Sequence, residues 1–123
     1  MINLKRAVLF GALLWMMIFF EVSILMFGFK LEAGTVYYII HYILAVILAL
    51  VTALVYFNGK KIKAGAKQGL LVGIIMALTG IILDAIITVP LFVKSYSFFL
   101  DTYLWIGILL GILTISLVGY LKK

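Results

Sequence analysis

Four long apolar runs, separated by short polar or basic segments, fill almost the whole chain. They cover residues 7–29, 35–57, 68–93 and 101–120. About 20 residues at a rise of ~1.5 Å each are enough for an α-helix to cross a hydrocarbon core ~30 Å thick. The pattern therefore predicts an all-α integral membrane protein. We expect a bundle of four antiparallel transmembrane helices that forms a single domain over residues 1–123.

Signals for helix ends and irregularities occur at three places. The second run stops at Asn58-Gly59, a pair typical of a left-handed helix end. The third run contains Pro90, the single proline of the chain. Because a proline inside a helix removes one backbone hydrogen bond and clashes with an earlier carbonyl, we expect a local kink there. Asp101 is expected to act as the N-cap of the fourth helix.

The composition supports the membrane class. Hydrophobic residues make up 67% of the chain, charged residues 11%, and the mean hydropathy is +1.36. Soluble domains have about 25% charged residues, so the charged surface that would cover a soluble core is missing. The chain has no cysteine, which excludes disulfides, thiol chemistry and Cys-ligated metals.

The basic residues predict the orientation. Eight of the ten Lys and Arg residues fall at the two chain ends and in the connector 60–67, which share one side; the other side has Lys30 and Lys94. The positive-inside rule then places both termini in the cytoplasm, in the cell membrane, and argues against dual topology. The lysines flank the apolar runs, so we expect membrane lipids and no nucleic acid as partners. A homo-oligomer is compatible with the sequence.

Three ionisable side chains are expected inside the membrane. Counted from the outer helix ends, Glu21 lies ~12 Å deep, His41 ~9 Å and Asp84 ~13 Å. A carboxylate in hydrocarbon costs about 2.5–3.5 kcal/mol on insertion scales, so it needs a partner or a wet cavity. Because three helices bring these groups to a similar height, we expect them to meet in one polar site in the outer half of the bilayer.

Three further residues are assigned to this candidate binding site. Tyr38 and Tyr42 flank the face of His41, although an aromatic belt at the membrane surface is the alternative for both. Thr88 follows Asp84 by one turn. Two acids outweigh one histidine, so the site would favour a cation, a proton or a small protonated solute. With one His and no ligand spacing, we expect neither a metal nor a cofactor.

Two functions from different classes follow. The first is transport or permeation through that polar site. The second is a structural or partner-binding membrane subunit in which the same residues only lock the helices together. A water-filled cleft leading to Asp84 favours transport, whereas direct and dry hydrogen bonds from the carboxyl groups favour the structural role. Motifs of phosphate-binding loops, metalloproteases and serine nucleophiles are missing, so we expect no enzyme.

Small residues at helical spacing predict where the helices approach closely. We expect the small-residue ridge of the third run to pack centrally, against the alanine stripe of the second run. The residues assigned to helix packing are Gly69, Gly73, Ala77 and Gly80 in the third run, Ala45 and Ala49 in the second, and Gly107 and Gly111 in the fourth.

The two halves of the chain also share an order of residues. Arg6, Gly11, Glu21 and Lys30 correspond to Lys67, Gly73, Asp84 and Lys94, at offsets of 61 to 64. Two duplicated hairpins would give this order, as a parallel repeat about an axis along the membrane normal.

Parts of the sequence resemble known membrane proteins. The segment FEVSILMFGF resembles the first span of small multidrug resistance transporters, whose pattern the later spans do not share. The fluoride channels are similar in length and span number. The stretch LDAIITVPLFVKSY is similar to small uncharacterised four-helix membrane proteins of archaea and little-studied bacteria. This last resemblance implies a fold and no activity.

Overall fold

Seven helical elements make up the computed structural model, which describes residues 4–30, 34–59, 62, 64–94, 96–100 and 102–122. Four of them are α-helices, two are π-helices and one is a 3-10 helix. In chain order they are α1 (Leu4–Ser23), η1 (Ile24–Gly28), α2 (Thr35–Phe57), α3 (Ala66–Leu83), η2 (Asp84–Val93), η3 (Tyr96–Leu100) and α4 (Thr102–Leu121). Asp101 and residues 60, 61 and 63 of the basic connector lie outside the described residues.

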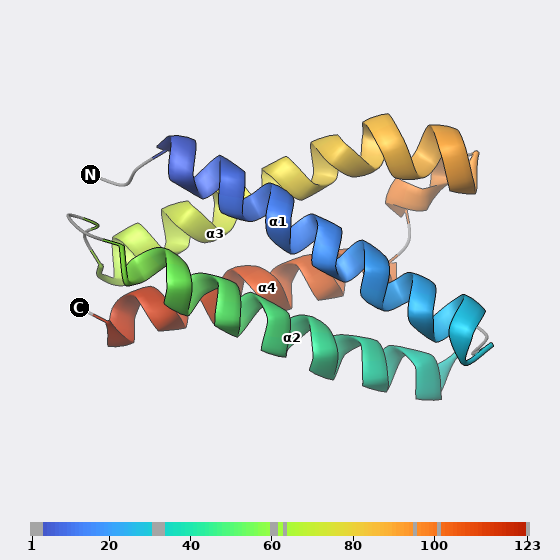
Figure 1. The fold of residues 1–123 in the computed structure, drawn as a ribbon, viewed down its shortest axis with the longest axis horizontal. Coiled ribbons are helices and arrows are strands. Elements are labelled where there is room, and N and C mark those ends of the chain that lie inside the picture. Colours follow the sequence, from blue (N-terminus) through green and yellow to red (C-terminus); the bar gives the residue numbers. More distant parts are fainter. Residues whose placement is uncertain are drawn as a thin grey trace.

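The all-α class and the four long helices are confirmed. Four helical stretches are long and apolar enough to cross a membrane: Leu4–Gly28, Thr35–Phe57, Ala66–Leu91 and Thr102–Leu121, of 25, 23, 26 and 20 residues. Figure 1 shows them lying along the long axis of the molecule, with the N- and C-termini at the same end. This composition and length indicate a small membrane protein.

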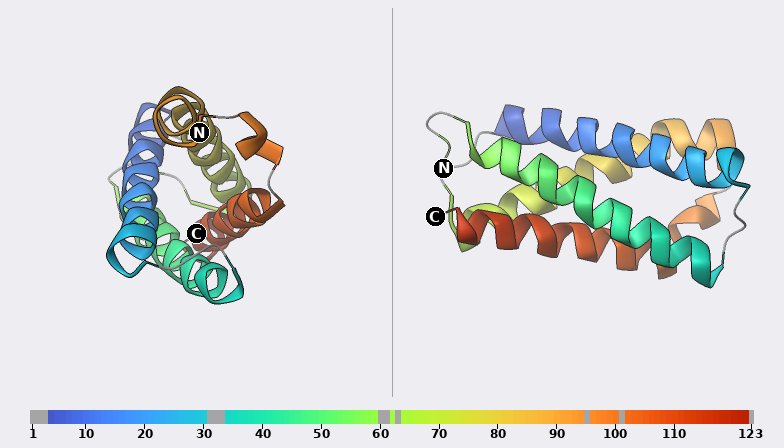
Figure 2. Two further views of the ribbon diagram at one scale, coloured as in Figure 1. Left: turned by 90° about the vertical axis from the view of Figure 1, so that its right-hand side faces the viewer. Right: turned by 60° about the horizontal axis from the view of Figure 1, so that its bottom comes forward.

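The four helices form a ring in the order α1, α2, α4, α3. Each helix packs mainly on its two neighbours in this ring, so α2 and α3 lie diagonally opposite (Figure 2). The core contains Tyr56 from α2, Val72 and Met76 from α3, and Ile115 from α4, all buried. Most large apolar side chains on the outer faces are exposed, as expected for helices that face lipid.

The small-residue ridge of α3 packs against α4, not against the alanine stripe of α2. A Cβ placed on Gly69 would lie 2.6 Å from the Ser116 backbone oxygen, and one on Gly73 would lie 3.2 Å from that of Ile112. The expected pairing with α2 was therefore wrong. Its alanines serve another purpose: Ala49 and Ala53 are buried in the core of the bundle.

The remaining packing residues have different surroundings. A Cβ placed on Gly80 would lie 3.9 Å from the Trp15 ring, and one on Gly107 would lie 3.4 Å from the Tyr42 ring. Nothing lies within 4 Å of a Cβ placed on Gly111. Ala45 and Ala77 are half-buried. The fourth helix therefore uses Gly107 for contact with α2 and leaves Gly111 open.

The ends of the first and third spans are π-helical rather than α-helical. The segment η2 begins at Asp84, runs for ten residues and contains Pro90. The local kink expected at Pro90 was derived for an α-helix, in which each amide bonds the carbonyl four residues earlier. In η2 the pattern is five residues apart, and the Lys94 amide donates to the Val89 carbonyl at 2.6 Å. The departure from α-helical geometry therefore covers all ten residues of η2 and is not confined to Pro90.

The C-terminal end of α2 is closed by Arg6. Asn58 has φ −81° and ψ −5°, so the left-handed ending expected from Asn58-Gly59 is not formed there. Instead, the Arg6 guanidinium donates to the Val55 carbonyl at 2.9 Å and to the Tyr56 carbonyl at 3.1 Å. The last carbonyls of a helix have no partner within the helix, so this long-range contact supplies one.

Candidate functional site

Glu21 and His41 form a direct pair between α1 and α2. The Nδ1 atom of His41 lies 2.8 Å from Oε1 of Glu21. The His41 side chain is 17% exposed and the Glu21 side chain 9%. Tyr37, one turn before His41, stacks on its ring with a centroid distance of 5.7 Å and an interplanar angle of 10°. Stacking on one side and the carboxyl on another fix the orientation of the imidazole.

The second carboxyl oxygen of Glu21 is buried and has no hydrogen-bond partner among the described residues. A buried polar atom without a partner costs ~1–3 kcal/mol, and more when it is charged. The pairing with His41 therefore satisfies only one of the two carboxyl oxygens of Glu21.

Asp84 is hydrogen-bonded by two donors at the start of η2. Its Oδ1 atom accepts from Nε1 of Trp15 and from Oγ1 of Thr88, each at 2.8 Å. Trp15 comes from α1, so this cluster joins the first and third spans. The bond from Thr88 stays within its own helix, one turn along. Asp84 thus has direct protein partners and is partly buried.

The expected meeting of Glu21, His41 and Asp84 in one site is not formed. Trp15 binds Asp84, and Glu21 binds His41. Trp15 and Glu21 are six residues apart on α1, or ~9 Å along its axis. Within the described part of the chain, no three His, Asp or Glu side chains lie close enough to hold one metal ion. The polar residues therefore form two pairs at different heights, both anchored on α1.

Tyr38 and Tyr42 lie on another interface, between α2 and α4. The Tyr38 ring stacks on that of Tyr103 with centroids 4.1 Å apart. The Tyr42 hydroxyl donates to the Tyr103 backbone carbonyl at 2.8 Å. These two tyrosines therefore fasten α4 to α2, whereas His41 on the same helix faces α1.

Two residues with central roles were not selected from the sequence. Trp15 lies eleven residues into α1, ~16 Å along its axis. Tryptophan favours the membrane surface, so a Trp at mid-depth was a usable signal for a buried partner. Arg6 was read as an interface anchor, and nothing local in the sequence indicates its contact with a helix end fifty residues away.

Two hollows lie on the surface: one of about 400 Å³ between α1 and α2, and one of about 260 Å³ lined by α1 alone. Glu21, His41 and Asp84 line neither of them. Glu21 and Asp84 are partly buried carboxyl groups, each bonded directly to a side chain of another helix.

Fold and site together indicate a small helical membrane protein whose spans are joined by buried polar pairs. Compared with protein-family models, with curated proteins and with solved structures, the chain gives no match.

Proposed function

We propose that this protein is a structural or partner-binding membrane subunit. Its four antiparallel spans lie in the cell membrane with both termini in the cytoplasm, and its buried polar residues lock the helices together. One observation carries this proposal: each intramembrane carboxyl is bonded directly to a side chain of another helix, Asp84 to Trp15 and Glu21 to His41. Direct bonds between side chains of different helices are what a locking role requires.

The strength of such bonds sets the expected effects. Hydrogen bonds between membrane helices contribute ~0.6 kcal/mol on average and up to ~1.7 kcal/mol in double-mutant cycles. Two such pairs, both on α1, join this helix to α2 and to α3. They therefore add specificity to an interface that is otherwise apolar.

The test replaces Asp84 in two ways. Asp84→Asn keeps an oxygen acceptor for Trp15 and Thr88, whereas Asp84→Leu leaves both donors without it. We expect Asp84→Asn to melt close to the wild type in detergent and Asp84→Leu to lose ~0.6–1.7 kcal/mol of stability. Equal melting of both variants and the wild type would contradict the locking role.

A second candidate function, transport of a cation, a proton or a small protonated solute, is favoured by the Oε2 atom of Glu21, which is buried and accepts no hydrogen bond from the described part of the chain. It is tested by proton and cation flux into liposomes that contain the wild type, Glu21→Gln or Asp84→Asn. The locking role predicts no flux above empty liposomes for all three. Flux in the wild type that Glu21→Gln abolishes would replace the structural proposal with transport.

The duplication of the two hairpins is supported by matched backbone features. Glu21 lies three residues before η1, and Asp84 is the first residue of η2. Each π-helix is followed by a lysine with positive φ, Lys30 at 56° and Lys94 at 61°. Positive φ is uncommon for residues other than glycine. Gly11 and Gly73, which correspond in the repeat, both lie at close helix contacts.

A further inference from the structure

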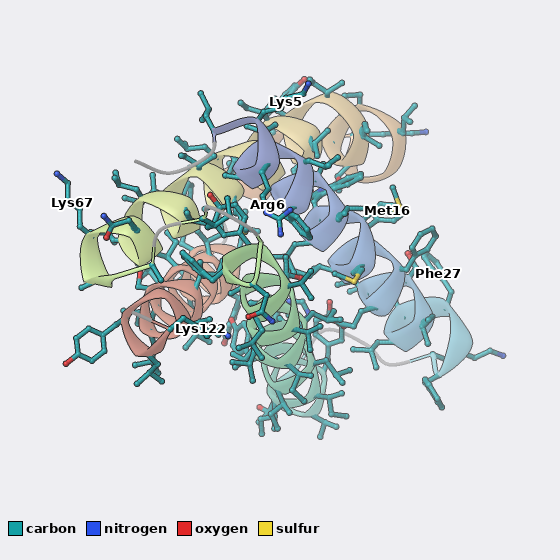
Figure 3. All side chains as sticks on the ribbon, turned by 60° about the vertical axis from the view of Figure 1, so that its left-hand side comes forward. Lys5, Arg6, Met16, Phe27, Lys67 and Lys122 are labelled. Atoms are coloured by element: carbon teal, nitrogen blue, oxygen red, sulfur yellow. The ribbon has the colours of Figure 1, made fainter. Side chains whose placement is uncertain are left out.

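A small basic hollow lies on α1 near the end of the bundle that carries both termini. Its lining residues are Lys5, Arg6, Leu9 and Phe10, and its volume is about 260 Å³. In Figure 3 the Arg6 side chain is directed toward α2, whereas Lys5 points away from the bundle. The Arg6 guanidinium also lies 4.7 Å from the centre of the Phe10 ring. Arg6 is therefore fixed in place with its charge beside the hollow.

A larger apolar groove continues along the same helix. It has a volume of about 400 Å³ and lies between α1 and α2. Its lining residues are Phe10, Leu13, Met16, Met17, Phe20, Val51, Thr52 and Val55. The Thr52 hydroxyl donates to the Leu48 carbonyl of its own helix, so the groove has almost no free polar group.

The two hollows share Phe10 and one face of α1. The lining positions of α1 recur at intervals of three or four residues, which places them on a single helix face. From Phe10 to Phe20 the groove extends ~15 Å along the axis. Half of a hydrocarbon core ~30 Å thick is also ~15 Å. The groove therefore matches the depth of one membrane leaflet, with the basic hollow at its surface end.

The charge at this end suits an anion. Of the acidic residues that the structure describes, Glu21 lies near the end of α1 and Asp84 at the start of η2, both toward the end of the bundle opposite Lys5 and Arg6. Basic pockets at the membrane surface bind the headgroups of anionic lipids. A phospholipid has both an anionic headgroup for the two cations and an acyl chain for the apolar groove. A soluble anion would occupy only the basic hollow, so the surface complements a phospholipid better.

We propose that this surface binds one anionic phospholipid of the cytoplasmic leaflet. The phosphate lies beside Lys5 and Arg6, and one acyl chain lies in the groove between α1 and α2. The lipid thus covers the gap between these two helices and holds them at the spacing set by Arg6. This inference rests on the membrane insertion proposed above, but not on the locking role of the polar pairs.

The test measures lipid binding to the full chain in a neutral detergent, by native mass spectrometry and by melting during lipid titration. The probes are phosphatidylglycerol and phosphatidylcholine with identical acyl chains, and inorganic phosphate. One basic residue near a membrane surface contributes ~1 kcal/mol, or about fivefold in affinity. We expect phosphatidylglycerol to bind at least about fivefold more tightly than phosphatidylcholine, and phosphate to leave the melting temperature unchanged.

Two variants and their matched controls locate the site. Lys5→Gln should weaken phosphatidylglycerol about fivefold, while Lys67→Gln, an exposed lysine at the same end, should not (Figure 3). Val51→Trp should fill the groove and weaken both lipids, while Ile43→Trp, on an exposed position of the same helix, should not.

Equal binding of the two lipids, or equal losses in Lys5→Gln and Lys67→Gln, would overturn the headgroup site. Unchanged binding in Val51→Trp would overturn the acyl groove. Each of these results leaves the Asp84 melting test untouched. Failure of the folded chain to enter detergent micelles or lipid would instead overturn both the membrane proposal and the lipid site.

Discussion

At the scale of single residues, the two carboxyl groups have unequal environments. Both hydrogen bonds of Asp84 go to Oδ1, from two donors, whereas Glu21 has one bonded oxygen and one buried oxygen without a partner in the described residues. Removing a partner from a buried polar group costs more than removing both members of a pair. The two sites should therefore respond differently to substitution.

The Glu21–His41 pair gives a prediction at this scale. His41→Leu leaves both oxygens of Glu21 buried and unpaired, so we expect it to destabilise the protein by ~1–3 kcal/mol. The double variant Glu21→Leu with His41→Leu removes the unpaired group as well and should be closer to the wild type. Chemical unfolding in detergent measures both. A double variant as unstable as the sum of the single variants would contradict the pairing.

At the scale of whole elements, α3 and α4 approach each other closely where glycines lie at their contact, at Gly69 and Gly119, but not at Gly111. A Cβ on Gly69 would lie 2.6 Å from the Ser116 oxygen and 2.9 Å from its Cα atom, so the two helices must separate to admit it. Gly119, on the other side of this contact, would place a Cβ 2.6 Å from the Cα atom of Gly69. This helix pair is therefore the tightest interface to probe.

We predict opposite effects for two glycine substitutions. Gly69→Ala should destabilise by ~1–3 kcal/mol, as overpacking of a closely packed interior does. Gly111→Ala meets open space and should be neutral or stabilise by up to ~1 kcal/mol, because alanine favours the helix over glycine. Thermal melting of the two purified variants provides the comparison. Similar destabilisation by both would indicate a general loss of helix flexibility rather than a contact.

The elements also show where reading the sequence stops. Run length alone predicts four helices, because in hydrocarbon the backbone must be satisfied within each helix. Run length contains no information about the change from α to π geometry at Asp84, since that depends on how η2 packs and on how Pro90 is accommodated. The sequence also did not predict which helix packs on the small-residue ridge, because a stripe of small residues fits any neighbouring helix.

At the scale of the whole molecule, the expected polar site was wrong because depth does not determine direction. Counting residues placed Glu21, His41 and Asp84 at similar heights, but helix rotation and crossing decide which side chains meet. Rotation directed His41 to Glu21, and the α1–α3 contact brought Trp15, rather than Glu21, to Asp84. The sequence correctly identified the polar residues that need a partner and two of their contacts, Glu21 with His41 and Asp84 with Thr88. It did not predict Trp15 as the partner of Asp84.

Orientation is the remaining property of the whole molecule, and the chain is well suited to a test because it has no cysteine. Asn58, just after α2, and Tyr96, at the start of η3, are both exposed and lie toward opposite ends of the bundle. The excess of lysine and arginine at the end with both termini predicts that this end faces the cytoplasm. A membrane-impermeant maleimide should therefore label Tyr96→Cys on intact cells and Asn58→Cys only after permeabilisation. Labelling of both single-cysteine variants on intact cells would show mixed insertion, and the reverse pattern would place the proposed lipid groove in the outer leaflet.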